Sequence, residues 1–246
     1  MLRRLTLATL AVLTLCLPGM AQEPPEGAYA DFVPNANGEP FGTWGETAPD
    51  TGLVTRIFAL SFAEACSWAI GNGEPEQRRP EIYDLSFRYS YDDAATPAHP
   101  LKLYRFFCNA GAYNEQHVFM LWDGDNGLRP VSFSQPTYTV ELEDPSNPDS
   151  AVTGMQLTGF SSVPTLVNSA VDPATGEITT RSCFRGICDA SSVGTWVLNE
   201  ADYRLKSFLV DPSYDGEVTM IEMVDFTLPA PIDMSAVVSD METATN

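Results

Sequence analysis

The chain has 246 residues, of which 44% are hydrophobic and 19% charged, a composition typical of a globular protein rather than a disordered one. Its 33 acidic residues outnumber its 13 basic residues and give a net charge of −20. A surface this negative argues against binding to nucleic-acid phosphates and against docking on anionic lipid headgroups.

Residues 1–21 have the pattern of a secretory signal peptide. Arg3 and Arg4 precede an uncharged apolar run over residues 5–17, and small residues lead to a cleavage point after Ala21. The run is too short to cross a bilayer, which disfavours the alternative of an uncleaved membrane anchor. We therefore expect a periplasmic or secreted protein with no membrane span after cleavage. Removal of both arginines changes the net charge to −22.

Proline and glycine are frequent in residues 22–50, which predicts an extended lead-in. Apolar residues over 53–70 then recur at the spacing of one helix face, and the Gly-Asn-Gly at 71–73 predicts where that helix ends. Alternation between Phe58 and Phe62 leaves a strand open as the alternative.

Alternating apolar segments and turn residues fill most of the remaining chain, which predicts a mainly β protein with one N-terminal helix. Antiparallel sheets in a sandwich- or barrel-like arrangement are the expected architecture, an α+β class stapled by disulfides. The expected strands are 82–91, 101–108, 116–122, 128–133, 137–142, 151–157, 165–171, 177–183, 194–198, 203–210 and 217–226.

A run of proline, serine, asparagine and aspartate at 145–150 predicts a boundary between two β-rich halves. The first half is expected to cover residues 51–145 and the second residues 150–228. Residues 229–246 are polar and are expected to form a loose tail.

Four cysteines remain after signal cleavage, and an even number in an exported chain predicts two disulfides. Three pairings are open, and we favour one bridge in each half of the chain. A four-cysteine zinc site is the rival interpretation, but neither half has the close paired spacing of such sites. The favoured pairs are Cys66–Cys108 and Cys183–Cys188.

The sequence contains no recognisable catalytic motif. His99 and His117 are its two histidines, and both are better interpreted as structural than as catalytic residues. We therefore assign no catalytic residue. A hydrolase that uses paired carboxylates stays open as an alternative because acidic residues are so numerous.

Asp123 and Asp125 begin a segment, Asp-Gly-Asp-Asn-Gly, that starts like a calcium loop but has no glutamate at the closing position. A tight hairpin explains the same residues without a metal. We expect no cofactor, with a calcium-dependent structural module as the alternative.

Residues 103–122 and 127–133, with Cys108 followed by Gly-Ala-Tyr-Asn at 111–114, resemble an exported bacterial family catalogued as domain of unknown function 1176. A later stretch, over 168–196, is similar to a second module of that family. The resemblance covers roughly residues 100–210 and implies export and a β-rich fold, but no activity. Independently of it, Gly111, Tyr113 and Asn114 suit a structural corner.

Arg185, Gly186 and Asp189 lie in or beside the loop that the second predicted disulfide would close. A constrained loop presents its arginine at low entropic cost, so these are the candidate binding residues. An arginine neutralised by a nearby carboxylate is the alternative. Together these features predict a non-catalytic binding or envelope-associated module whose partner is a cationic protein or an envelope component.

Overall fold

A computed structural model describes residues 47–73, 77 and 79–227. The predicted signal peptide, nearly all of the predicted lead-in and the predicted tail lie outside these residues. Within the described part of the chain, no helix combines the length and the apolar character needed to cross a membrane.

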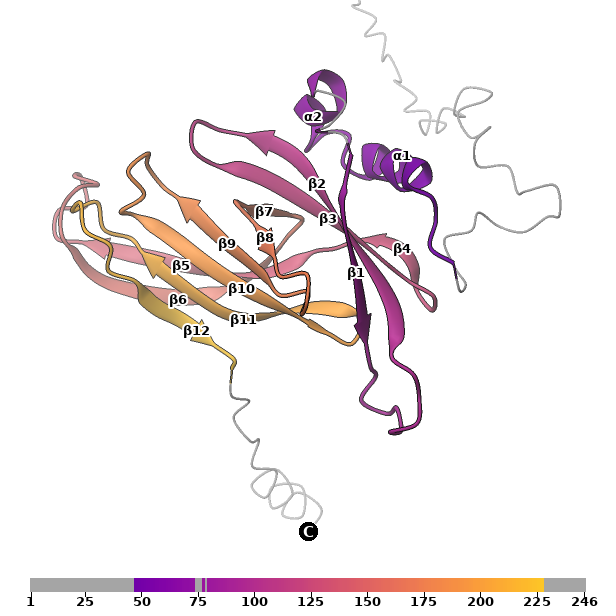
Figure 1. The fold of residues 1–246 in the computed structure, drawn as a ribbon. Coiled ribbons are helices and arrows are strands. Elements are labelled where there is room, and N and C mark those ends of the chain that lie inside the picture. Colours follow the sequence, from indigo (N-terminus) through magenta and orange to yellow (C-terminus); the bar gives the residue numbers. More distant parts are fainter. Residues whose placement is uncertain (1–46, 74–76, 78, 228–246) are drawn as a thin grey trace, which may run out of the picture. The chain divides into compact units, whose positions relative to one another are not determined.

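The first sheet is antiparallel and contains five strands, with β3 at its centre (Figure 1). The order β1-β2-β3-β4 follows the chain, and β7 joins from the later part of the sequence by pairing with β3. The strands are β1 (Glu81–Phe87), β2 (His99–Ala110), β3 (Glu115–Asp123), β4 (Gly127–Pro130) and β7 (Thr165–Val167).

A second antiparallel sheet of five strands has the order β12-β11-β10-β9-β8. Its strands are β8 (Ala170–Val171), β9 (Ile178–Cys183), β10 (Ser191–Asn199), β11 (Asp202–Asp211) and β12 (Ile221–Asp225). The hairpin of β5 (Phe133–Leu142) and β6 (Val152–Val163) forms a separate two-stranded sheet.

One apolar core joins the two large sheets. Alternate residues of β3, such as Phe119 and Leu121, pack in this core with Trp196, Tyr203 and Phe208 of the second sheet. Both large sheets remain open and share this face, so the mainly β, antiparallel, sandwich-like class predicted from the sequence is confirmed.

The opposite face of the first sheet is covered by two short helices, α1 (Thr51–Ser61) and α2 (Ser67–Asn72). Asp50 caps α1 by accepting a hydrogen bond from the Leu53 N–H at 3.1 Å. The side chain of Phe58 stacks on Phe106 of β2, with ring centroids 4.1 Å apart. Because helices cover one face and the second sheet covers the other, β3 is buried on both sides.

The single helix predicted over 53–70 is wrong in one respect, because a turn at 62–66 divides it. The side chains of Phe62 and Cys66 are both buried against the first sheet, and Cys66 is bonded to Cys108 of β2. A straight helix over 53–70 could not keep the Cys66–Cys108 disulfide and also direct the apolar residues near both of its ends toward the twisted sheet. The chain therefore turns at 62–66.

The predicted strands are found, but several differ in extent. The strand expected over 82–91 ends at Phe87, and the strand expected over 151–157 continues to Val163. The strand expected over 165–171 is divided into β7 and β8 at Asn168, which has a positive φ of 45°. The strand expected over 217–226 is shorter, since β12 covers Ile221–Asp225. The predicted boundary at 145–150 is the turn of the β5–β6 hairpin, and residues from both sides of it contribute to the shared core.

Candidate functional site

The predicted Gly-Ala-Tyr-Asn corner connects the two large sheets. Asn114 accepts hydrogen bonds from the Cys183 N–H at 3.1 Å and from the Asn168 side chain at 2.9 Å, and it donates to the Cys183 carbonyl at 2.8 Å. The Tyr113 hydroxyl donates to the Phe184 carbonyl. This corner therefore fixes the start of the loop closed by the Cys183–Cys188 disulfide, which the structure contains as predicted.

Within that loop, Arg185 and Asp189 form an ion pair. The Arg185 Nε donates to Asp189 at 2.7 Å, and a second guanidinium nitrogen contacts the other carboxylate oxygen. These hydrogen bonds hold the pKa of the Asp189 carboxyl well below its usual range. Two of the three predicted binding residues, Arg185 and Asp189, thus neutralise each other, and Arg185 is not a free cation.

The same pair holds the segment that connects β11 to β12. Arg185 donates to the Tyr214 carbonyl at 2.8 Å and its guanidinium lies over the Tyr214 ring, 5.2 Å from the centroid. Asp189 accepts from the Gly216 N–H at 3.0 Å. The role of Arg185 and Asp189 in this geometry is to position residues 211–219 beside the disulfide loop.

The buried carboxylate of Asp211 gives that segment its shape. It accepts from the backbone N–H of Ser213 at 3.0 Å, from the Ser213 hydroxyl at 2.6 Å and from the Thr219 N–H. Burial alone would raise the pKa of Asp211, but these hydrogen bonds outweigh it and lower the pKa. Asp211 is therefore structural, whereas Asp215 and Glu217 on the same segment are exposed.

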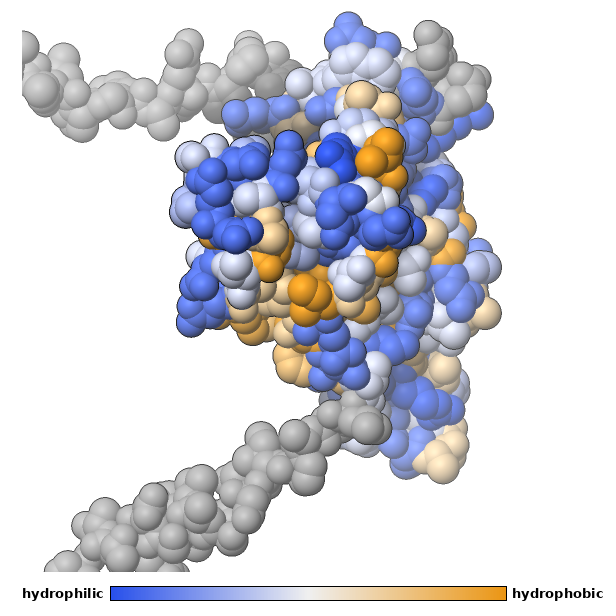
Figure 2. All heavy atoms as spheres, turned by 90° about the vertical axis from the view of Figure 1, so that its left-hand side faces the viewer, coloured by the Kyte–Doolittle hydropathy of each residue, from blue (hydrophilic) through white to orange (hydrophobic). Residues whose placement is uncertain are grey.

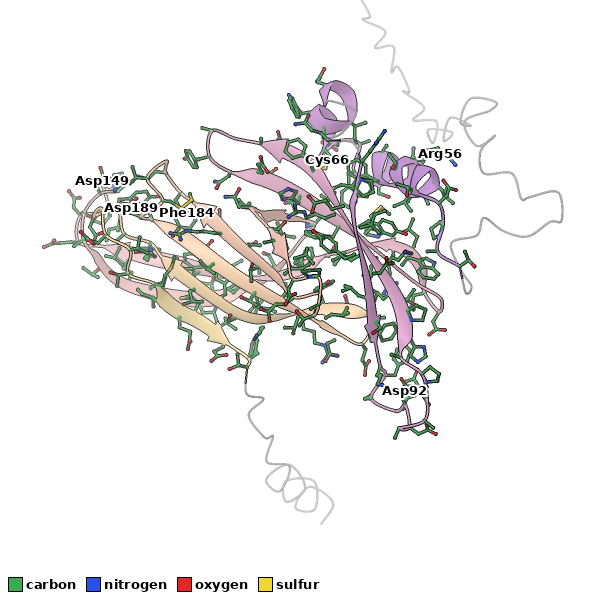
Figure 3. The ribbon with its side chains drawn as sticks, viewed as in Figure 1. Arg56, Cys66, Asp92, Asp149, Phe184 and Asp189 are labelled. Atoms are coloured by element: carbon green, nitrogen blue, oxygen red, sulfur yellow. A yellow bond between two sulfur atoms is a disulfide. The ribbon has the colours of Figure 1, made fainter. Side chains whose placement is uncertain are left out.

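The turn of the β5–β6 hairpin lies at this end of the sheets as well. Figure 3 shows Asp149 of that turn near Phe184 and Asp189 of the disulfide loop, far from Cys66 beside the helices. We call the hairpin turn (143–151), the loop 183–190 and the segment 211–221 together the acidic end. The chain has no lysine or arginine between Arg129 and Arg181, and none after Lys206.

Two adjoining cavities open at the acidic end and share Pro212 and Tyr214. The larger one, of about 470 Å³, is lined in part by Asp149 and Asp215. The smaller one, of about 200 Å³, is apolar and is lined by Tyr138, Val140, Leu142, Pro148, Phe184, Pro212 and Tyr214. Figure 2 views this side of the molecule, where hydrophobic patches lie among hydrophilic residues.

The predicted metal residue Asp123 forms the turn between β3 and β4. One oxygen accepts from the N–H groups of Asp125 and Asn126 at 3.0 and 2.8 Å, and the other accepts from Arg129 at 2.6 Å. Burial raises the pKa of Asp123, but the Asn126 and Arg129 hydrogen bonds outweigh this effect and lower it. A calcium ion would have to displace the arginine, so this arrangement does not fit the ion.

Asp125, the other predicted metal residue, accepts a hydrogen bond from the Tyr89 hydroxyl at 3.1 Å. Within the residues that the structure describes, no group of three or more His, Cys, Asp or Glu side chains is arranged to hold a metal.

A buried serine–histidine pair, which sequence reasoning missed, joins β3 to the segment between β7 and β8. The Ser169 Oγ lies 3.1 Å from the Nδ1 of His117, whose Nε2 is 3.9 Å from Glu115. Burial, aided by Arg105, lowers the pKa of His117 to about 4. A nucleophile needs an accessible hydroxyl and an oriented base, whereas Ser169 is 5% exposed and Glu115 lies beyond hydrogen-bonding distance.

Comparison with known proteins adds no assignment: no family model matches the sequence, no curated protein is a significant match, and no solved structure matches the fold. The resemblance to the exported family of unknown function stays a prediction.

Proposed function

We propose that this chain is an exported, non-catalytic binding module whose acidic end binds a cationic segment of an envelope protein. One observation carries the proposal: exposed carboxylates gather at the acidic end, two of them lining the cavity that adjoins the apolar one, and the single basic residue of its three segments is already paired. The nearby Arg181 is exposed and donates to the Cys188 carbonyl. Asp149, Asp215 and Glu217 supply the carboxylates, and Arg185 is already paired with Asp189.

A lysine or arginine side chain has the chemistry that this end would recognise. Its aliphatic stem can lie against Tyr138, Val140 and Phe184 in the apolar cavity while its charged group reaches the carboxylates at the rim. The negative charge of the whole chain adds long-range attraction that speeds the approach of such a partner.

Export is part of the proposal. The predicted signal peptide and the two disulfides, Cys66–Cys108 and Cys183–Cys188, support an oxidising compartment, the periplasm or the exterior. A partner in that compartment would be a basic protein or a basic envelope component.

The proposal is tested by a pull-down from periplasmic extract with the purified, oxidised protein as bait and a salt gradient for elution. We expect a basic partner that is released at moderate salt, because screening weakens exposed charge pairs. Bait carrying Asp149→Asn and Glu217→Gln should lose that partner, and the fold should tolerate both changes because each carboxylate is exposed and accepts no hydrogen bond from the described residues.

The matched control bait carries Glu64→Gln and Asp202→Asn, which make the same change in net charge away from the acidic end. It should retain the partner. A partner that both baits lose equally, or a failure of the protein to retain any basic partner, contradicts the proposal.

A further inference from the structure

Strand β6 is an unusual edge strand. It pairs with β5 on one side, and no other described strand pairs with it. Its sequence, VTGMQLTGFSSV, contains no charged residue and no proline over 12 residues. Edge strands of this length normally carry charges or prolines that prevent them from pairing with other chains.

The other free edges of the described sheets follow that rule. The edge strand β1 contains Glu81 and Asp84, and β12 contains Glu222 and Asp225. Strand β5, whose other side is also an edge, contains Pro136 and Glu141. The remaining edge strands β4, β7 and β8 have four residues or fewer. In a chain with a net charge of −20, the uncharged β6 is therefore the exception.

The backbone of β6 has hydrogen-bonding groups that point away from β5. The carbonyl of Ser134 in β5 points away from β6, because it accepts from the Trp196 indole N–H at 2.9 Å. In an antiparallel pair, two directly opposed residues direct their backbone N–H and C=O groups either both toward the partner strand or both away from it. The N–H of Ser162, which is opposite Ser134, and that of Phe160, two residues earlier, consequently point to the free edge.

Apolar side chains lie along the same edge. Leu157 is opposite Tyr138 and Phe160 is opposite Pro136, and the extra residue at Thr158 places both apolar side chains on one face of the hairpin. Tyr138 on that face packs against the core. Leu157 and Phe160 remain 39% and 49% exposed.

We infer that β6 pairs with β6 of a second copy of this chain, antiparallel and about a two-fold axis, to form a continuous four-stranded sheet. Such an interface is self-complementary, as closed homodimers require. It would bring Leu157 and Phe160 of the two copies together and would pair the outward backbone groups.

Because β6 is uncharged, it is a place where two copies of a chain with a net charge of −20 can meet without opposing carboxylates in the contact itself, and antiparallel pairing keeps their charged turns apart. Antiparallel pairing of strands about 40 Å long places the two acidic hairpin turns at opposite ends, several times farther apart than the Debye length of roughly 8 Å. A parallel arrangement would bring the turns together. A basic peptide strand would be attracted by the charge of the whole chain, but β6 itself offers it no carboxylate to pair with.

The inference is independent of the proposed function, because the acidic end stays accessible in both copies. The two also respond to salt in opposite ways. Screening should tighten a dimer of two negatively charged chains, whereas it should weaken the binding of a cationic partner.

Sedimentation velocity of the purified full chain, from low-micromolar to near-millimolar concentration, tests the inference. We expect a reversible monomer–dimer equilibrium. Ser162→Pro removes an outward N–H in each copy without removing a bond to β5, so it should raise the dimer dissociation constant roughly tenfold or more. Ser162→Ala is the control at the same position and should leave the constant nearly unchanged.

Circular dichroism checks that the proline variant is folded. If it is not, Ser161→Lys on β6 is compared with Thr139→Lys on β5, two exposed sites with the same charge change. The lysine on β6 should weaken the dimer more than the lysine on β5. A chain that stays monomeric at every concentration, or a dimer that responds equally to the matched variants, overturns the inference.

Discussion

His117 is the residue whose charge depends most directly on folding. Its side chain is buried beside Arg105 and Ser169, and burial lowers its pKa from 6.5 to about 4. The unfolded chain therefore binds a proton near pH 6.5, whereas the folded chain does not until about pH 4. Because the unfolded state holds more protons in this interval, the contribution of His117 to stability is lost as the pH falls from 6.5 toward 4.

We predict that this effect costs roughly 2 to 3 kcal/mol of unfolding free energy across that interval. Urea unfolding of the wild type and of His117→Asn, at several pH values between 4 and 7, measures it. The wild type should lose more stability than the variant on acidification. Parallel curves would show that His117 does not titrate differently in the folded state.

Asn114 is the second residue with a specific expected effect. Its side-chain amide makes three hydrogen bonds, to Cys183 and Asn168, that connect the first sheet to the second. Asn114→Ala leaves those groups without partners, so it should cost about 2 kcal/mol of unfolding free energy.

The matched control is Asn109→Ala, because the exposed Asn109 side chain accepts one hydrogen bond, from the adjacent Ala110 N–H. That substitution should change the free energy of unfolding by no more than about 0.5 kcal/mol. Equal losses in chemical unfolding would contradict the role of Asn114 as the connection between the sheets.

Among the elements, the two disulfides differ in the length of chain that they close. Cys66–Cys108 has a sequence separation of 42 and joins the helices to β2, whereas Cys183–Cys188 has a separation of 5. The chain-entropy model predicts losses of about 4 kcal/mol for the first bridge and about 2 kcal/mol for the second.

Paired alanine variants of each bridge, unfolded in guanidinium chloride, compare these losses. The variant that lacks Cys66–Cys108 should be the less stable of the two, and it should lose helical signal before the sheets unfold. A larger loss on removing Cys183–Cys188 would contradict the model for this chain.

Local sequence patterns predicted where the strands lie along the chain better than which strands pair with each other. Alternation and turn residues placed the strands because each strand has one face toward a core and is limited by local turn chemistry. The pairing of β7 with β3 could not be predicted from the sequence, because the three residues of β7 have no pattern that identifies a strand far away in the chain as their partner. The break at 62–66 likewise depends on a long-range disulfide rather than on helix propensity.

The candidate site was predicted in part. Arg185, Gly186 and Asp189 do lie at the acidic end, because the short disulfide loop was visible in the sequence. Asp149, Asp215 and Glu217 were missed, since they come from turns that are far apart in the chain and are brought together by the fold. The absence of lysine and arginine from residues 143–151 and 211–221 was the feature of the sequence that could have identified these carboxylates.

For the molecule as a whole, the dominant feature is its negative charge. With a net charge of −20 and a pI of about 4.2, the folded chain repels itself at neutral pH. We predict that raising sodium chloride from low to physiological concentration stabilises the monomer by roughly 1 kcal/mol, seen as a rise of a few degrees in Tm. The rise should shrink near the pI. A Tm that falls with salt at neutral pH would contradict this account.

The most direct measurement of the central claim is the dissociation constant of decalysine, determined at several salt concentrations by isothermal titration calorimetry. We predict binding that weakens steeply with salt, and a several-fold weaker affinity for the Asp149→Asn, Glu217→Gln variant than for the Glu64→Gln, Asp202→Asn variant. Equal affinities for the two variants would mean that decalysine responds to overall charge alone. That result, or no binding at low salt, would contradict a cation-binding role for the acidic end.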